Sequence, residues 1–451
     1  MSKKSAGKNV RELALDLILS VEKNQSYSNL LLNTVINKNH LSPADSGLLT
    51  ELTYGTIQYK LTLDYYLEPY IKNSKKMDQW VRILLRLSLY QMHYLDKIPD
   101  HAVIFEAVEI SKRRGHKGIA SLVNGILRNI QRNGVRSLDE LSDPVERISI
   151  ETSHPAWIVK RWMEQYGEER TRNMCQYNLK HPKQTARVNI SKASREKVLE
   201  MLKEEGFSVE PIRFLPEGIT CLKGNLALSN AYKEGFLSIQ DESSMLVAYA
   251  VDAKDKNTIL DCCAAPGGKT SAIAEKMEKG TVYALDLHEH KVKLIKQQAE
   301  RLGLANVTAS AHDARKAGEL FDPQTFDAIL VDAPCSGLGV MRRKPDVKYT
   351  KNEQDIHRLA AIQQDILAAV APLLKDGGLL VYSTCTVDQE ENDQVTEAFL
   401  KQHPQFSKDT TLKNRLPEEV RRFASDNSLQ LFPQDLGSDG FFIACFRKKD
   451  Q

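Results

Sequence analysis

Residues 258–270 read TILDCCAAPGGKT, and this stretch decides the fold of the second half of the chain. An apolar run ends at Asp261, small residues follow, and the Pro-Gly-Gly of 266–268 precedes a helix-compatible run over 270–277. A buried parallel strand that leads through a tight turn into a helix is the opening unit of a nucleotide-binding α/β sheet. Glycine in that turn lets the backbone approach a ligand that a Cβ would block.

A carboxylate follows at a distance that suits a ribose. Asp286 closes the next apolar run, 281–285, and lies 19 residues beyond Gly267. At the end of a second strand it is placed to accept hydrogen bonds from ribose hydroxyls. A phosphate loop GxxxxGK[ST] is excluded, because it would need glycine where the chain has Cys263, and GxGxxG is absent. The pattern favours a nucleoside without phosphate, usually S-adenosylmethionine; the alternative is a plain turn between strand and helix.

Length and composition indicate a multidomain globular protein. At 451 residues the chain exceeds the size at which one core keeps growing, so two or three domains are expected. No run approaches the length of apolar sequence that a membrane span requires, and we expect no membrane association. The seven cysteines form no CxxC pair and have no suitably spaced histidine, so neither a metal site nor a disulfide framework is indicated. A reducing, cytoplasmic location is expected.

Charge is distributed unevenly along the chain. The net charge is +3, but residues 1–140 hold 20 Lys and Arg against 14 Asp and Glu, which is +6 and leaves −3 for the rest. A basic front half is typical of a nucleic-acid-binding module, and the alternative is a solvated helical surface. The basic stretch 112–118, with Arg128 and Arg132 one helical turn apart, favours contacts with RNA phosphates over simple complements to the helix dipole.

The periodicity of apolar residues changes along the chain. Spacings of three and four predict helices throughout 8–140, whereas 143–235 mixes helical and strand patterns. Helices are expected over 158–166 and 194–205, and strands over 185–190 and 218–222. Beyond Gly235, a helix capped by Asp241 or Ser243 leads into alternating strands and helices. These comprise strands over 258–260, 281–285, 307–310, 326–331 and 379–383, a helix over about 354–374 stopped by Gly377-Gly378, and an antiparallel pair over 430–432 and 441–446.

These patterns predict an α/β protein with three domains. Residues 1–142 form an all-α RNA-binding bundle, 143–235 a small α+β domain that links the others or binds RNA, and 236–451 a Rossmann-like domain that uses S-adenosylmethionine. In such a sheet, ligands gather at the carboxyl ends of the strands.

Reactive side chains stand at those predicted strand ends. Asp261, Asp286, Asp332 and Cys385 close four strands, and Asp313 lies just past another. A second cysteine, Cys335, lies in the turn VDAPCSG after the strand 326–331. A lone cysteine is more often a small buried apolar residue. Two cysteines at neighbouring strand tips, each in a turn of small residues, favour a function.

The motifs DCCAAPGGKT, LDL, VDAPCSGLGVMRRKPD and VYSTCTVDQEEN resemble those of the RNA cytosine-5 methyltransferases of the Fmu/Sun (NOL/NOP) family. The segments LTYGTIQYKLTLDYYL and VNGILRN resemble the antitermination-factor B-like RNA-binding domain found in one branch of that family. The resemblance covers nearly the whole chain. It implies methyl transfer from S-adenosylmethionine to C5 of one cytidine in 16S ribosomal RNA, through a covalent cysteine–C6 adduct. The expected partner is the small-subunit RNA, and a monomer is expected.

The resemblance also implies roles for individual residues. Cys385 is the nucleophile, and Cys335 assists removal of the C5 proton and release of the product. Asp332 binds either the cytosine edge or the cofactor, Asp286 the ribose and Asp313 the adenine amino group. Lys269 belongs to the cofactor turn, and alternatively steers a substrate phosphate or caps the turn. The cofactor set is Cys263, Ala264, Ala265, Pro266, Gly267, Gly268, Lys269, Asp286, Asp313 and Asp332, and the basic cluster Arg342, Arg343 and Lys344 is expected to contact the RNA backbone.

Two alternatives stay open at this point. The same chemistry could act on transfer RNA or on large-subunit ribosomal RNA. The protein could instead be an RNA-binding ribosome-assembly factor with a vestigial methyltransferase domain. The intact aspartates and cysteines at the strand ends argue against the second alternative.

Overall fold

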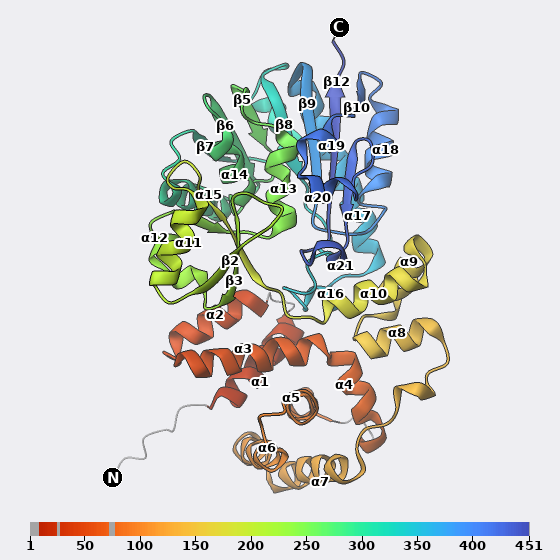
Figure 1. Cartoon of the computed structure of the whole chain (residues 1–451). Coiled ribbons are helices and arrows are strands. Elements are labelled where there is room, and N and C mark those ends of the chain that lie inside the picture. Colours follow the sequence, from red (N-terminus) through yellow and green to blue (C-terminus); the bar gives the residue numbers. More distant parts are fainter. Residues whose placement is uncertain (1–8, 25–27, 72–76, 451) are drawn as a thin grey trace. The chain divides into compact units, whose positions relative to one another are not determined.

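The computed structural model describes residues 9–24, 28–71 and 77–450, and Figure 1 shows its elements. The chain divides into two compact units. The helical unit comprises Met1–Lys180 together with Arg343–Thr350, and the α/β unit comprises His181–Arg342 and Lys351–Gln451. The first eight residues of the predicted N-terminal domain lie outside the described residues. The boundaries of the three domains expected from the sequence stay a prediction.

The helical unit is built from amphipathic helices. In α3, Ser42 caps the first turn by accepting a hydrogen bond from the Asp45 N–H. Leu49 and Leu52, three residues apart on this helix, are fully buried. The helices predicted over 8–140 are thus confirmed for the described residues. The helices are α1 (Val10–Asn24), α2 (Ser28–Lys38), α3 (Pro43–Gln58), α4 (Lys60–Leu67), α5 (Gln79–Tyr94), α6 (Asp100–Arg114), α7 (Lys117–Asn133), α8 (Pro144–Thr152), α9 (Ala156–Tyr166), α10 (Glu168–Asn178) and α16 (Val347–Thr350).

One segment of the helical unit comes from far along the chain. Within Arg343–Thr350, the Lys348 ammonium donates a hydrogen bond to the Gln58 carbonyl at 2.9 Å. The Tyr349 hydroxyl lies 3.0 Å from the Ser153 carbonyl and donates to it. The segment is therefore held by polar contacts to residues about 200 to 290 positions earlier in the sequence.

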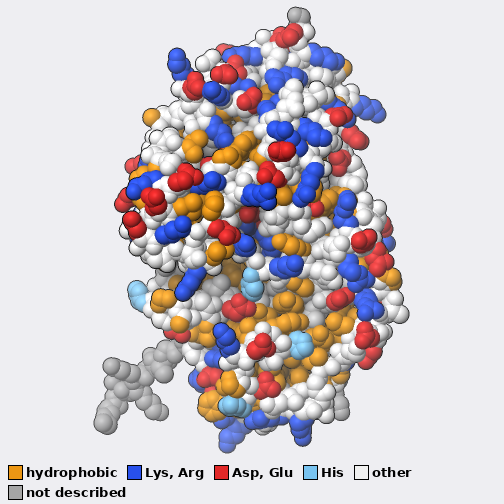
Figure 2. Space-filling view, in the orientation of Figure 1, with side chains coloured by type: hydrophobic (Ala, Val, Ile, Leu, Met, Phe, Trp, Pro, Cys, Tyr) orange, Lys and Arg blue, Asp and Glu red, His pale blue; other side chains and the backbone are white. Residues whose placement is uncertain are grey.

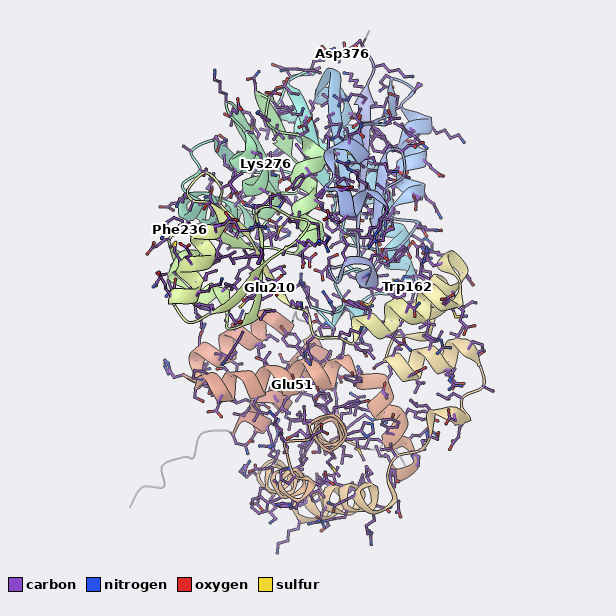
Figure 3. The ribbon with its side chains drawn as sticks, in the orientation of Figure 1. Glu51, Trp162, Glu210, Phe236, Lys276 and Asp376 are labelled. Carbon is purple, nitrogen blue, oxygen red and sulfur yellow. The ribbon has the colours of Figure 1, made fainter. Side chains whose placement is uncertain are left out.

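The α/β unit begins with a small antiparallel sheet in the order β2-β3-β1-β4. Its strands are β1 (Gln184–Val188), β2 (Ser208–Pro211), β3 (Gly218–Lys223) and β4 (Leu237–Ile239). Helix α11 (Arg195–Glu204) packs on this sheet through Val198 and Leu202, and α12 (Asn230–Lys233) precedes β4. The sequence predicted β1 and β3 but missed β2 and β4, because strands of four and three residues carry too few alternations to show a period. Glu210 on β2 and Phe236 before β4 mark this sheet in Figure 3.

A second, larger sheet forms the centre of the α/β unit, in the order β10-β12-β9-β8-β5-β6-β7, with β11 beside β12. Neighbouring strands in the run β9-β8-β5-β6-β7 are parallel to one another. Strand β12 is antiparallel to its neighbours β9, β10 and β11, and its pairing with β11 confirms the predicted terminal pair. Its strands are β5 (Thr258–Asp261), β6 (Thr281–Asp286), β7 (Val307–Ala311), β8 (Phe326–Asp332), β9 (Leu374–Thr384), β10 (Phe406–Lys408), β11 (Ser428–Leu431) and β12 (Phe441–Lys448).

Helices cover both faces of this sheet (Figure 1). One buried core joins it to α13 (Glu242–Val251) and α14 (Gly268–Lys276), and another joins it to α17 (Glu353–Val370) and α18 (Asp393–Gln402). Helix α15 (Glu289–Leu302) packs beside β6 and β7. The chain moves outward from β5 to β7 and then returns to β8 on the other side of β5. The switch point of this doubly wound sheet therefore lies between β5 and β8, where ligands bind in such folds.

Two details refine the predicted elements. Asp241 is the residue that caps α13, by accepting a hydrogen bond from the Ser243 N–H. The prediction that Gly377-Gly378 stops the helix is wrong, because α17 ends at Val370 and both glycines lie inside β9. A Cβ on Gly378 would come within 2.7 Å of the Leu374 side chain, so the close packing of the strand requires glycine there. None of the described helices is long and apolar enough to cross a membrane.

Candidate active site

The two predicted cysteines lie side by side at the ends of neighbouring parallel strands. Cys335 lies in the turn after β8, and Cys385 follows β9 directly. Their sulfur atoms are 3.4 Å apart, and both side chains are half-buried. The hydrogen bond with Cys385, followed by burial, raises the pKa of Cys335 well above its ordinary value. Cys335 therefore stays protonated at neutral pH and can donate its S–H to the Cys385 sulfur.

A half-buried ion pair accompanies the cysteines. Lys269, in the first turn of α14, donates from Nζ to Oδ2 of Asp332 at 2.7 Å, and the two side chains are 16% and 24% exposed. The other oxygen of Asp332 accepts a hydrogen bond from the Ser383 hydroxyl at 2.8 Å. Burial alone would lower the pKa of Lys269, but the attraction of Asp332, aided by Cys385, raises it above its ordinary value. The lysine therefore stays charged, and a positive charge near Cys385 favours the thiolate of that cysteine.

The glycine turn joins β5 to α14, as the sequence predicts. Gly267 has a φ of 104°, in the left-handed region, and a Cβ on it would lie 3.3 Å from the backbone of Ile295. The Ala264 N–H donates to the Leu285 carbonyl at 2.8 Å, which ties the turn to the end of β6. The backbone of the turn is thereby placed at the carboxyl edge of the sheet.

Asp286 faces this turn from the end of β6. Its two carboxylate oxygens each accept one hydrogen bond of 3.3 Å, from the N–H groups of Ala265 and His288. A carboxylate has about four lone-pair positions, so these bonds leave accepting capacity for the hydroxyls of a ribose. A buried carboxylate with spare acceptors beside a turn that cannot wrap phosphate fits the nucleoside part of S-adenosylmethionine.

Asp313 lies at the adjacent strand end, after β7. Its neighbour His312 donates an N–H to the Asp286 carbonyl at 3.0 Å, so the two aspartates belong to one edge of the sheet. The Asp313 carboxylate pairs with Arg315 at 2.6 Å, and this hydrogen bond lowers its pKa. An adenine amino group would therefore share this carboxylate with Arg315.

Asp261 has a structural position beneath the turn. Its Oδ2 accepts a hydrogen bond from the Thr270 hydroxyl at 2.7 Å, which joins the end of β5 to α14. The side chain is fully buried, and this burial raises its pKa to about 7. Its Oδ1 has no hydrogen-bond partner among the described residues. The carboxyl group is thus half satisfied, directly below the predicted cofactor turn.

The structure does not bring every predicted RNA contact to the surface. Arg342 is buried, and its guanidinium donates to the Gly437 carbonyl at 2.6 Å, whereas Lys344 of the same cluster is exposed. In the stretch 112–118, three residues pair with carboxylates: Lys112 with Glu109, Arg113 with Glu12, and Arg114 with Asp16. Figure 2 shows Lys and Arg side chains interspersed with Asp and Glu on the face in view.

Several residues that hold this site together could not be predicted from the sequence. Glu391 and Asn392 lie in the quoted motif VYSTCTVDQEEN, yet nothing in the motif indicated that they contact the cysteine turns. Arg187 lies in the small sheet and is buried, pairs with Glu275 at 2.7 Å, and donates to the Gly268 carbonyl at 3.1 Å. A long-range contact of this kind leaves no local pattern in a single sequence.

Three family models match successive parts of the chain. The model described as 16S rRNA methyltransferase RsmB/F matches residues 248–447, and the NusB family model matches residues 8–132. The ferredoxin-like domain of RsmF/B-like methyltransferases matches residues 154–227.

Similar proteins cover the whole chain. A protein of Bacillus subtilis (strain 168) named "probable ribosomal RNA small subunit methyltransferase B" is 57% identical over 98% of this chain and 99% of its own length. A protein of Synechocystis with the same name is 33% identical over 97% of this chain and 99% of its own. The protein in the crystal structure of PH0851 is 26% identical in sequence, and the match covers 99% of this chain and 100% of the PH0851 chain with a TM-score of 0.82. A methyltransferase homologue from Pyrococcus horikoshii is 28% identical over 68% of this chain and all of its own, with a TM-score of 0.57.

The fold has a doubly wound sheet, a glycine turn that lacks a phosphate-binding loop, and Asp286 beside that turn. Together with the family match, these features define a Rossmann-like methyltransferase that takes its methyl group from S-adenosylmethionine. The matches along the entire chain narrow this class further. The chain belongs to the RsmB/F family of 16S rRNA methyltransferases.

Proposed function

We propose that this protein methylates C5 of one cytidine in 16S ribosomal RNA, through a covalent bond between Cys385 and C6 of the base. The observation that carries the proposal is the pair of sulfur atoms 3.4 Å apart at the ends of β8 and β9. A methyltransferase that acts on an oxygen or nitrogen atom does not need a thiol. Cytosine C5 is a weak nucleophile, and adding a thiolate to C6 turns C5 into an enamine-like carbon that can attack a methyl donor.

The surroundings of each sulfur support different roles. The ammonium of Lys269 favours the thiolate of Cys385, and we assign Cys385 as the nucleophile that adds to C6. S-Adenosylmethionine supplies an electrophilic methyl group on a sulfonium, which C5 accepts. Loss of the C5 proton to water then restores the C5–C6 double bond and expels Cys385 as a thiolate. Cys335 stays protonated, so its S–H stabilises the departing thiolate by a hydrogen bond.

Asp332 and the cofactor turn complete the assignment. Asp332 holds the charge of Lys269 in place and keeps lone pairs free for the amino edge of the cytosine. For the cofactor we propose the set predicted from the sequence, with Asp286 on the ribose and Asp313 on the adenine. The target atom is inaccessible in a stacked helix, so the cytidine is unpaired or flipped out. We also propose that residues 1–142 bind the RNA, and that the protein is monomeric and acts where this RNA is found, in the cytoplasm.

Bisulfite sequencing of ribosomal RNA tests this function. In cells that lack the protein, one cytidine of 16S ribosomal RNA should lose its protection from bisulfite. Wild-type protein should restore that protection, and Cys385→Ala should not. Protection lost in transfer RNA or large-subunit RNA would change the substrate but keep the chemistry. Unchanged protection everywhere, with no S-adenosylmethionine binding in titration calorimetry, would favour the assembly-factor alternative.

A further inference from the structure

The loop between β9 and α18 ends in two buried polar residues that have no place in the proposed chemistry. Glu391 and Asn392 are both fully buried, and they are adjacent in the sequence. The Tyr382 hydroxyl fixes their backbone by donating to the Glu391 carbonyl at 2.6 Å. Their side chains reach the two cysteine turns separately.

Glu391 holds the turn that carries Cys335. One oxygen of its carboxylate accepts the Ser336 N–H at 2.8 Å, and the other accepts the Ser336 hydroxyl at 2.5 Å. The Gln363 amide donates both to Glu391 at 3.0 Å and to the Pro334 carbonyl at 3.0 Å. The residues immediately before and after Cys335 are therefore both tied to the Glu391 carboxylate, directly or through one side chain.

Asn392 holds the turn that carries Cys385 in the same manner. Its Oδ1 accepts a hydrogen bond from the Thr384 hydroxyl at 2.6 Å, and its Nδ2 donates to the Thr386 carbonyl at 3.2 Å. The Nδ2 group also donates to the Gln430 side chain at 3.0 Å, which fixes the orientation of the amide. The residues on both sides of Cys385 are thereby bonded to one amide.

The two turns are also linked to each other. The hydroxyls of Ser336 and Thr386 lie 2.9 Å apart, and the Asp388 N–H donates to the Thr386 hydroxyl at 3.3 Å. The Ser336 hydroxyl hydrogen is used in the bond to Glu391, so Ser336 cannot also donate to Thr386. The Thr386 hydroxyl therefore donates to the Ser336 oxygen and accepts from the Asp388 N–H. The Glu391 carboxyl group, whose pKa burial raises to about 7, thus ends a chain of hydrogen bonds that runs across both cysteine turns. Burying a carboxylate costs free energy, and the hydrogen bonds from Ser336 and Gln363 offset that cost.

We propose that Glu391 and Asn392 are a pair of positioning residues, with Glu391 orienting Cys335 and Asn392 orienting Cys385. The inference rests on the proposed function, because it divides the two residues between adduct formation and adduct release. It predicts that the two neighbours, although only one residue apart, affect opposite halves of the reaction. A general role in packing would weaken both halves equally.

Two measurements separate these halves. RNA that contains 5-fluorocytidine traps the adduct, because fluorine cannot leave as a proton does, and its rate of trapping reports formation. With ordinary RNA, the fraction of protein that migrates with RNA on a denaturing gel reports slow release. We expect Glu391→Gln to trap at the wild-type rate but to accumulate adduct on ordinary RNA, with turnover reduced about 10-fold to 100-fold. We expect Asn392→Ala to slow trapping by about the same factor and to accumulate no adduct.

Milder variants guard against loss of folding. Ser336→Ala removes one hydrogen bond to Glu391 and should show a weaker form of the Glu391→Gln defect. Thr384→Val removes one hydrogen bond to Asn392 and should show a weaker form of the Asn392→Ala defect. Glu390→Gln is the matched control, since the Glu390 carboxylate pairs with His357 on α17. Equal loss of trapping and release in both pairs of variants, or no loss in either, would overturn the inference. If wild-type protein traps no 5-fluorocytidine RNA, the covalent mechanism itself fails instead.

Discussion

Two lysines with little exposure to solvent, one in each unit, meet different surroundings. Lys269 in the α/β unit lies 2.7 Å from the Asp332 carboxylate, which raises its pKa against the effect of burial. Lys348 in the helical unit is fully buried, and its ammonium donates to the Gln58 carbonyl. Burial lowers the pKa of Lys348 to about 7, and the nearby Cys175 offsets this only in part.

The difference shows what keeps a charge in a protein interior. A carbonyl oxygen stabilises an ammonium group less than a carboxylate does, so burial decides the protonation of Lys348 and the ion pair decides that of Lys269. The permanent charge is found where the proposed chemistry needs a thiolate. The weakly held charge is found in the helical unit, where it costs stability.

The largest expected effect comes from removing the paired lysine. Lys269→Met leaves Asp332 as a half-buried carboxylate without its cation and withdraws the positive charge near Cys385. We expect the rate of adduct formation on 5-fluorocytidine RNA to fall about 10²-fold to 10³-fold. Lys276→Met, on the same helix but paired with Glu217, is the matched control and should trap RNA at the wild-type rate. A wild-type rate in Lys269→Met would show that the charge has no role.

A second variant leaves Lys269, like Lys348, without a carboxylate partner. Asp332→Asn removes the carboxylate while Lys269 stays largely shielded from solvent, so the pKa of Lys269 should fall. Turnover should drop about 10²-fold, and the remaining activity should decline further as the pH rises and Lys269 loses its proton. Wild-type protein should show no such decline, since its lysine stays charged. Rate profiles between about pH 6 and pH 9 measure this, and parallel profiles would contradict it.

The third variant removes the buried charge of Lys348, which destabilises the helical unit. The pKa of Lys348 is about 7 in the folded protein, compared with its ordinary value of 10.5. Between these two pH values the unfolded chain binds more protons than the folded protein. The free energy of unfolding therefore rises with pH in this range. Lys348→Met should raise the free energy of unfolding near pH 7 by about 1–3 kcal/mol and flatten that rise. Urea unfolding followed by circular dichroism at neutral and alkaline pH measures both effects. Equal pH dependence in the two proteins would contradict the assignment.

The smallest expected effect concerns cations at the surface of the helical unit. Arg114 pairs with Asp16, whereas Lys117 is exposed at the start of α7. Lys117→Gln should reduce the salt dependence of RNA binding by about one phosphate contact, and Arg114→Gln should reduce it by less. Fluorescence anisotropy with labelled ribosomal RNA across a salt series measures both slopes. A larger change in Arg114→Gln would show that RNA displaces its carboxylate.

The strand ends could be read from the sequence because the physics there is local. An apolar run, a turn of small residues and a carboxylate occupy consecutive positions, so Asp261, Asp286 and Asp332 were found at the ends of β5, β6 and β8. The turns with Cys335 and Cys385 were predicted on the same grounds.

Other features depend on contacts between distant residues. Arg342 looked like part of a surface cluster, and only the fold shows that its guanidinium reaches Gly437. The acidic partners of Arg113 and Arg114 lie on α1, about 100 positions away, so the local charge count overstated the free positive charge. The hydrogen bonds of Glu391 to Ser336 likewise span 55 positions.

The identity of the attacking sulfur is the most direct test of the covalent mechanism. Protein trapped on 5-fluorocytidine RNA can be digested with protease and nuclease, and the modified peptide identified by mass spectrometry. We expect a single nucleotide attached to Cys385 in the wild-type protein and also in Cys335→Ala. A nucleotide attached to Cys335, or methyl transfer to RNA by Cys385→Ala, would contradict it.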